Sequence, residues 1–269
     1  MNEEFRRHLG IEESSRVTGG CIHECYKVLI QKKPFFLKCN VAAFEDAFAA
    51  EADGLAGLRR AGYRAPEPRS VDVAAGHAYL LMEFLELKGR VDFPALGRML
   101  ARAHRTTGPR YGWSRDNYIG ATPQINAWSD DWSAFWFERR MEPQFELAKK
   151  KGFSLPDVSR DLLQGHKPEA SLLHGDLWSG NVSFTPGGPV VFDPAVYYGD
   201  READLAMTEL FGGFPREFYA AYNEALPLPK EYEQRKHLYN LYHLLNHLNL
   251  FGRSYLGQVE RTLGLLLRL

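Results

Sequence analysis

The feature that most constrains this 269-residue chain is a polar loop that follows directly on a short apolar run. Leu172–Leu173 leads into a His-Gly-Asp triplet that ends at Asp176, and Asn181 lies five residues further on. A second apolar run, Val190–Phe192, ends at Asp193. Carboxylate and amide oxygens at the ends of adjacent strands are hard ligands of the kind that Mg²⁺ prefers. The pattern therefore predicts three oxygen-bearing side chains gathered at one place.

The same spacing resembles the catalytic loop and metal-binding strand of kinases. It predicts that Asp176 accepts the proton of a substrate hydroxyl, while Asn181 and Asp193 hold Mg²⁺ on the nucleotide phosphates. Gly175 stands where protein kinases have arginine, which indicates the small-molecule kinases of the same fold. The alternative is that these are turn residues that merely cap strands. It requires the His-Gly-Asp loop and the strand that ends at Asp193 to match the kinase spacing by chance.

Composition excludes several other classes of protein. Hydrophobic residues make up 45% of the chain and charged residues 25%, as in ordinary soluble globular proteins. The net charge of -1 provides no broad basic field for nucleic acid. We find no apolar stretch of the roughly 18 residues that a membrane span requires, and the charged N-terminus predicts no signal peptide. Three cysteines, an odd number, predict no structural disulfides, so we expect a cytoplasmic protein.

Apolar periodicity predicts an α+β protein with two lobes, as in protein-kinase-like folds. Residues 1–85 are expected to form a small β-rich N-lobe with one main helix, and residues 86–269 a mostly helical C-lobe. The expected N-lobe elements are strands at 26–30, 34–38, 69–73 and 78–82 and a helix at 43–60. The expected C-lobe helices cover 94–105, 132–149, 215–225 and 231–254.

The nucleotide site is predicted from residues of the N-lobe. Lys38 ends an apolar strand and is placed to reach the α- and β-phosphates, while Glu51 on the next helix holds its ammonium group. Alternatively, the Lys38 side chain extends to water and Glu51 is a surface residue. A further alternative is that Glu45, not Glu51, is the helix partner of Lys38. Glu45 is near the helix start, where it complements the dipole.

Two further segments are expected to contact ATP. The backbone N–H groups of Gly19, Gly20 and Cys21 are expected near the phosphates, although an ordinary hairpin turn fits this short pattern equally well. The backbone of Glu83, Phe84 and Leu85, between the lobes, is expected to bind adenine. The predicted cofactors are therefore ATP and Mg²⁺.

Other residues leave alternatives open. Trp178 either stacks on the apolar face of a sugar or packs against the other lobe. Asp204 either accepts backbone N–H bonds from the catalytic loop or caps its own helix. His243 and His247, four residues apart on a helix, have a spacing able to bind zinc, but a packing role is favoured because no third ligand is evident.

The resemblance to known kinases is not limited to the catalytic loop. It extends over five segments: His174–Asn181, Phe192–Thr208, Leu210–Phe214, Asp116–Gly120 and Leu245–Gly252. Together they make the chain resemble the fructosamine kinase (ketosamine 3-kinase) family, related to aminoglycoside phosphotransferases. The resemblance implies ATP-dependent phosphorylation of the 3-hydroxyl of a ketosamine, which is the adduct of a sugar with a free, peptide or protein amine. The phosphorylated adduct breaks down and frees the amine, which is deglycation.

The resemblance also implies residue roles. Asp176 would act on the sugar hydroxyl, and Trp178, Asn117 and Asp116 would lie near the sugar. Some relatives carry a cysteine where Cys21 stands, which suggests a redox-linked homodimer; an inert thiol is the alternative.

Two competing functions remain. One is a related kinase for an aminoglycoside, choline or another metabolite, which the lack of a dense acidic cluster beyond residues 200–204 disfavours. The other is a non-catalytic pseudokinase, which the presence of Lys38, Asp176, Asn181 and Asp193 disfavours.

Overall fold

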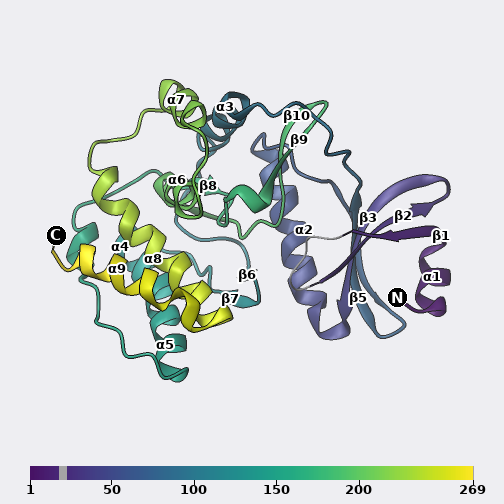
Figure 1. Cartoon of the computed structure of the whole chain (residues 1–269), viewed down its shortest axis with the longest axis horizontal. Helices are drawn as coiled ribbons and strands as arrows, with labels where there is room; N and C mark the ends of the chain where they lie inside the picture. The colour runs from purple at the N-terminus through teal and green to yellow at the C-terminus, as the bar shows by residue number, and fades with distance from the viewer. Residues whose placement is uncertain (18–22, 269) are drawn as a thin grey trace.

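The computed structural model describes residues 1–17 and 23–268 and has two lobes (Figure 1). The N-lobe is built on a five-stranded antiparallel sheet in the order β1-β2-β3-β5-β4. Its strands are β1 Ile11–Arg16, β2 Glu24–Ile30, β3 Lys33–Val41, β4 Pro68–Ala74 and β5 His77–Glu83. Its helices are α1 Glu3–Leu9 and α2 Glu45–Arg60, the latter preceded by a 3-10 turn at Ala42–Phe44.

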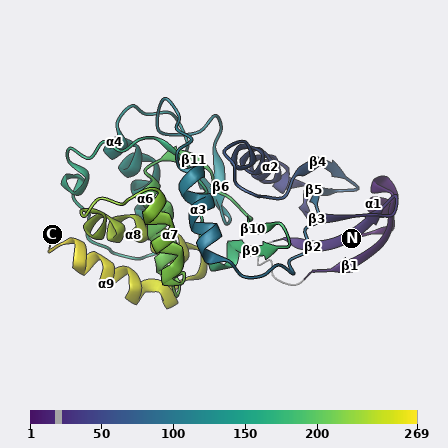
Figure 2. The same ribbon diagram turned by 90° about the horizontal axis from the view of Figure 1, so that it is seen from above.

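The two faces of this sheet are buried against different partners because side chains alternate along each strand. On β5, Tyr79 and Leu81 join Phe5 of α1 in a small core, while Leu80 joins the main core on the other side. Phe48 of α2 lies in that main core. The sheet therefore separates α1 from α2, as Figure 2 shows.

The first two elements, α1 and β1, were not predicted, because the first strand expected from the sequence begins at residue 26. Asn2 caps α1 by accepting a hydrogen bond from the Phe5 N–H, and Gly10 ends it in the left-handed conformation. With Phe5 its one buried residue, the helix is too short to show an apolar period.

The C-lobe is mainly helical, as predicted. Its helices are α3 Phe93–Ala103, α4 Trp132–Trp136, α5 Glu142–Lys150, α6 Arg201–Leu210, α7 Arg216–Ala225, α8 Tyr232–Phe251 and α9 Leu256–Leu266. The 3-10 segments are Arg160–Leu163, Ser179–Asn181 and Arg253–Tyr255, and a π-helical turn at Phe137–Met141 joins α4 to α5. The short strands are β6 Asn117–Ile119, β7 Thr122–Gln124, β8 Ser171–Leu173, β9 Val182–Thr185, β10 Gly188–Val191 and β11 Tyr197–Gly199.

Two close backbone approaches fix the position of the central hairpin β9–β10 and of the helices above it. A Cβ atom added at Gly89, in the connection between β5 and α3, would lie 2.1 Å from the Thr185 carbonyl oxygen. A Cβ atom at Gly97 of α3 would lie 2.4 Å from the Phe218 oxygen of α7, the neighbouring helix in Figure 1. Glycine at both positions lets the interlobe connection and α3 pack directly on backbone.

Within the described ranges, no helix combines the length and apolarity needed to cross a bilayer.

Candidate active site

The loop after β8 is held from behind by a buried carboxylate. Asp204 of α6 accepts hydrogen bonds from the backbone N–H groups of His174 (2.7 Å) and Gly175 (2.8 Å). Burial would raise the pKa of Asp204, but the hydrogen bond from His104 and the N–H donors hold it below its ordinary value. Of the two roles considered for Asp204, the structure supports the contact with the loop. The cap of α6 is Asp200, whose side chain accepts from the Glu202 N–H.

His174 and Gly175 shape the loop. The His174 ring is fully buried; its Nε2 donates to the Phe192 carbonyl (2.8 Å) and its Nδ1 accepts from the Asp176 N–H (3.2 Å). Gly175 has a φ of +83°, and a Cβ atom there would lie 2.0 Å from the Ala195 carbonyl oxygen. Only glycine combines that conformation with that approach, which explains why arginine is absent here.

Asp176 and Asn181 are joined directly. The Asn181 amide Nδ2 donates to the backbone oxygen of Asp176 (2.9 Å) and to its carboxylate (3.1 Å), which leaves the Asn181 Oδ1 as an acceptor. The Asn181 carbonyl accepts from the Phe192 N–H (2.9 Å), next to Asp193. Burial, and then the Asp193 charge, raise the pKa of Asp176 to about 7 against the hydrogen bond from Asn181. A carboxylate with a pKa near neutrality suits general-base chemistry.

Lys38 joins the two lobes. Its Nζ donates to Glu51 Oε1 (2.7 Å) and to Asp193 Oδ1. Burial alone would lower the pKa of Lys38, but the carboxylates of Asp193 and Glu51 raise it above its ordinary value. Partial loss of water around the Asp193 carboxylate would raise its pKa, but the Lys38 ammonium holds that pKa below its ordinary value. The exposed Glu45 lies in the first turn of α2, so the structure favours Glu51 as the helix partner.

These contacts bring Lys38, Glu51, Asp176, Asn181 and Asp193 together. Asp193 is the exposed member, with 54% of its side chain accessible, and it has a φ of +50°, unusual for a residue with a side chain. The Asn181 Oδ1 and the Asp193 carboxylate are a hard oxygen donor set of the kind that Mg²⁺ takes beside phosphate oxygens. The residues present therefore fit a nucleotide-bound magnesium ion.

The segment between the lobes has backbone groups available. The Glu83 N–H donates to the Glu67 carbonyl (2.8 Å), so it is occupied within the sheet. In the described part of the chain, nothing hydrogen-bonds the N–H groups of Phe84 and Leu85. The Lys27 ammonium lies 4.6 Å from the centre of the Phe84 ring. The Glu83 N–H is therefore not available to adenine. The prediction that the Phe84 and Leu85 backbone binds adenine is compatible with these contacts.

Asn117 and Asp116 are engaged elsewhere. Asn117 is 4% exposed; it donates to the Val196 carbonyl (2.8 Å) and accepts from Gln124 (2.8 Å). Asp116 accepts from the Asn126 N–H (2.7 Å). Both side chains support surrounding backbone, and none of these contacts directs them toward Asp176. Their placement near a sugar remains a prediction from the family resemblance.

Trp178 packs within the C-lobe, with its ring centre 6.1 Å from that of Phe211 in an edge-to-face contact. A Cβ atom at Gly180 would lie 2.3 Å from the indole, so glycine is needed where the ring crosses the loop. The indole is half-buried, which leaves part of it available beside Asp176.

Gly19, Gly20 and Cys21 lie outside the described residues, so the phosphate-loop and redox-dimer hypotheses remain predictions. Cys25 and Cys39 are buried free thiols. Cys25 is paired in register with Lys38, and Cys39 with Glu24, so the two thiols lie on opposite faces of the sheet. This agrees with the expectation that they form no disulfide.

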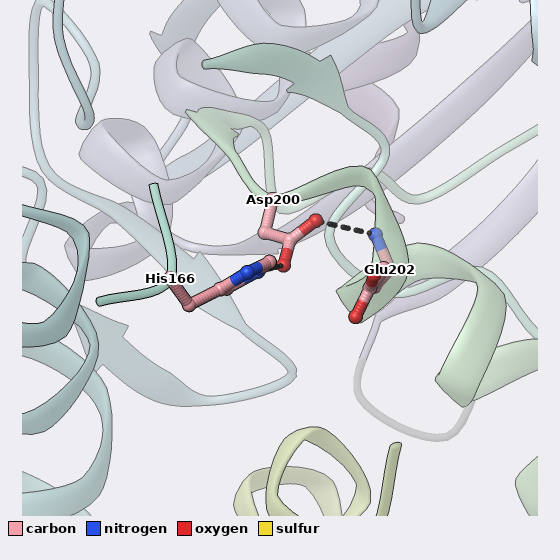
Figure 3. Close-up of side chains that lie close together, drawn as sticks. All are labelled: His166, Asp200 and Glu202. Atoms are coloured by element: carbon pink, nitrogen blue, oxygen red, sulfur yellow. Dashed lines mark hydrogen bonds and ion pairs between the residues drawn. The ribbon is translucent and has the colours of Figure 1, made fainter. Parts of the chain in front are cut away.

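Sequence reasoning missed a cluster of His166, Asp200 and Glu202, shown in Figure 3. Its ligand atoms lie within 4.8 Å of one another, close enough to hold a metal ion. Protein groups already compensate the charge, since Arg235 makes two 2.7 Å bonds to Glu202. Tyr239 and His166 bond to Asp200 at 2.6 and 2.7 Å. We interpret the cluster as a structural anchor of α6.

His243 and His247 belong to no metal-binding group among the described residues.

Comparison with known proteins agrees with this geometry. A family model described as fructosamine kinase matches residues 1–269. A protein named "probable ketoamine kinase" from Synechocystis sp. is 44% identical, covering 96% of this chain and 92% of the relative. One of the same name from Vibrio parahaemolyticus is 42% identical over 94% of this chain and 92% of its own length.

Solved structures show the same relation. A crystal structure described as "putative fructosamine-3-kinase" from Haemophilus somnus has a TM-score of 0.91 and 31% identity, covering 98% of this chain and 94% of the other. An aminoglycoside phosphotransferase, APH(4)-Ia, in complex with ADP and hygromycin B, has a TM-score of 0.65 at 15% identity, covering 98% and 99% of the two chains. At that identity the second comparison shows the kinase-like fold alone.

Proposed function

Because the chain belongs to the fructosamine kinase family, we propose that it transfers the γ-phosphoryl group of ATP to the 3-hydroxyl of a ketosamine. The observation that carries the proposal is the convergence of Lys38, Glu51 and Asp193 on the Asp176–Asn181 pair. Phosphoryl transfer needs phosphates held, charge neutralised and a hydroxyl oriented, and little other chemistry. The five side chains supply these three requirements.

Each residue has a separate task in this proposal. Asp176 accepts a hydrogen bond from the attacking hydroxyl and takes its proton late in the transfer. Lys38, fixed by Glu51, contacts the α- and β-phosphates, while the oxygens of Asn181 and Asp193 are the ligands for Mg²⁺. The metal ion supplies neutralisation of phosphate charge. Asp204 and His174 keep the Asp176 backbone in place.

A ketosamine is favoured over a polycationic aminoglycoside because the acidic residues between 200 and 204 are bonded to other protein groups. Asp204 is bound to loop N–H groups, Glu202 to Arg235, and Asp200 to Tyr239 and His166. No carboxylate of this set is therefore available for substrate amines. Phosphorylation at O3 destabilises the sugar–amine adduct, so the proposed biological outcome is deglycation.

Trp178 is proposed as the surface on which the sugar stacks. Gly180→Ala pushes a methyl group into the indole, and we expect the ring to move because a side chain yields more easily than backbone. The expected result is a rise in KM for the ketosamine of about tenfold, the scale of a lost stacking contact, with an unchanged KM for ATP. Steady-state kinetics with each substrate varied in turn checks this, and an unchanged ketosamine KM would count against the role of Trp178.

A substrate panel tests the function. Purified protein with ATP and Mg²⁺ is offered fructosyl-, ribulosyl- and erythrulosyl-amines, an aminoglycoside and choline, and kcat/KM is compared. We expect the ketosamines to exceed the other acceptors by at least about a hundredfold, because a site built around a substrate's polar groups can discriminate by up to about 10⁴- to 10⁵-fold. A preference for the aminoglycoside or choline would identify the alternative kinase class, and no turnover with any acceptor would support a pseudokinase.

A further inference from the structure

Five aromatic side chains are in continuous contact next to the catalytic loop. Four of them, which we name the aromatic wall, come from the end of α6, from α8 and from the following 3-10 turn: Phe211, His247, Phe251 and Tyr255. The Phe211 and His247 ring centres are 4.7 Å apart, and those of His247 and Tyr255 are 5.0 Å apart. Trp178 joins the wall to the loop through its contact with Phe211.

The wall is not simply part of the core. Phe251 is 55% exposed, and the other three rings are half-buried. The rings of Phe251 and His247 are 5.5 Å apart, and those of Phe251 and Tyr255 are 6.0 Å apart. Grouped aromatic residues that stay partly exposed near a reactive loop are more typical of a binding surface than of packing.

His247 adds one polar atom to the wall, and its tautomer is fixed by a neighbour. The Nδ1 atom lies 2.8 Å from the His243 carbonyl oxygen, which can only accept, so the proton is on Nδ1. Burial lowers the pKa of His247, which keeps the ring neutral at pH 7. The Nε2 atom is therefore an acceptor, and none of the residues that the structure describes donates to it.

Aromatic faces with a single hydrogen-bond acceptor match the chemistry of a protonated secondary amine. The ring faces attract the cation through their quadrupoles, and Nε2 accepts one ammonium N–H. The nearest basic residue on this segment, Arg253, has its guanidinium 5.9 Å from the Phe153 ring. That contact keeps its charge on another aromatic side chain and does not place it against the wall.

We propose that the aromatic wall binds the secondary ammonium group of the ketosamine, with the first carbons of the amine's substituent. The inference rests on the proposed function, because the ketosamine nitrogen is only a few bonds from the 3-hydroxyl that Asp176 addresses. Trp178, the proposed sugar surface, contacts Phe211 of the wall, so a sugar stacked on Trp178 lies next to the wall. The wall thereby distinguishes a ketosamine from an uncharged ketose of the same shape.

The test uses a matched pair of acceptors: an N-alkyl ketosamine and the corresponding C1 ether, in which oxygen replaces the ammonium group. The ratio of their kcat/KM values reports recognition of the charge and cancels general effects on the enzyme. We expect Phe251→Leu and Tyr255→Leu, which keep apolar bulk but lose a ring, to lower the ratio about 3- to 30-fold each. Tyr255→Phe, which keeps the ring, is expected to retain most of the ratio.

Two further variants separate the parts of the proposal. His247→Phe keeps a ring but removes the acceptor, and it is also expected to lower the ratio. The control is Trp128→Leu, since Trp128 is an exposed aromatic residue (39%) whose ring is stacked on Tyr198, which is not a member of the wall. We expect no change of the ratio in that variant.

The outcomes distinguish failure of this inference from failure of the function. If the wild-type protein phosphorylates ketosamines but the leucine variants keep the wild-type ratio, the inference is overturned and the kinase assignment stands. An equal fall for ketosamine and ether, with no change of ratio, also overturns it, because the rings would then act only through structure. If the wild-type protein phosphorylates neither acceptor, the proposed function fails and the inference fails with it.

Discussion

Asp176→Asn is expected to lower kcat by about 10²- to 10⁴-fold, the range that a positioned general base contributes. The substitution keeps the size of the side chain and can still accept from the Asn181 amide, so the loop should keep its shape. It removes the carboxylate that takes the hydroxyl proton. Measurement of kcat together with the Kd of a non-hydrolysable ATP analogue checks this, and the Kd is expected to change less than about threefold.

Asp193→Ala is the contrasting variant. Asp193 is bound to Lys38 and is proposed to hold the metal ion, so its loss should weaken binding of Mg²⁺–ATP as well as turnover. Near-normal kcat in Asp176→Asn would contradict the base assignment. Unchanged Mg²⁺–ATP affinity in Asp193→Ala would contradict the metal assignment.

Gly175→Ala is expected to destabilise the fold by about 4 kcal/mol, at the upper end of single-residue effects. A left-handed φ of +83° accounts for about 1–2 kcal/mol of this for a residue with a Cβ atom. The remainder comes from the backbone collision, because the Ala195 oxygen would lie 2.0 Å from the new atom. Denaturant unfolding measures the loss.

The matched control is Gly62→Ala. Gly62 has nearly the same conformation, with a φ of +89°, but a Cβ atom there would meet nothing within 4 Å. It should lose only the conformational part, about 1–2 kcal/mol. Equal losses in the two variants would show that the loop does not need close contact with the Ala195 backbone.

Local sequence patterns predicted the parts of the site that are close together in the chain. Asn181 lies only five residues after Asp176 and donates to its carboxylate, so one short motif supplies both side chains. The choice of Glu51 over Glu45 required the structure, because both are on α2 and only the packing of that helix brings Glu51 to Lys38. The two lobes and the helices α2, α3, α7 and α8 followed from clear apolar periods, whereas α9 was not predicted.

Contacts between distant segments were not predictable in the same way. His104 and Asp204 meet across 100 residues, and the aromatic wall joins the catalytic loop to α8 and the turn beyond it. Nothing local indicates that the Asn117 side chain is bonded to Val196 and Gln124, and its placement near the sugar remains a prediction from the family resemblance. Asp200 was not recognised as the α6 cap because Asp204, in the first turn, fits the same local pattern.

The most direct test of the central claim is to locate the phosphate in the product by NMR. The protein is incubated with Mg²⁺–ATP and a ketosamine labelled with ¹³C in the sugar, and the carbon coupled to phosphorus is identified before the adduct decomposes. We predict one phosphomonoester, on the 3-oxygen, followed by release of the free amine. A phosphate on any other oxygen, or a ketosamine left unmodified while ATP is bound, would contradict the account.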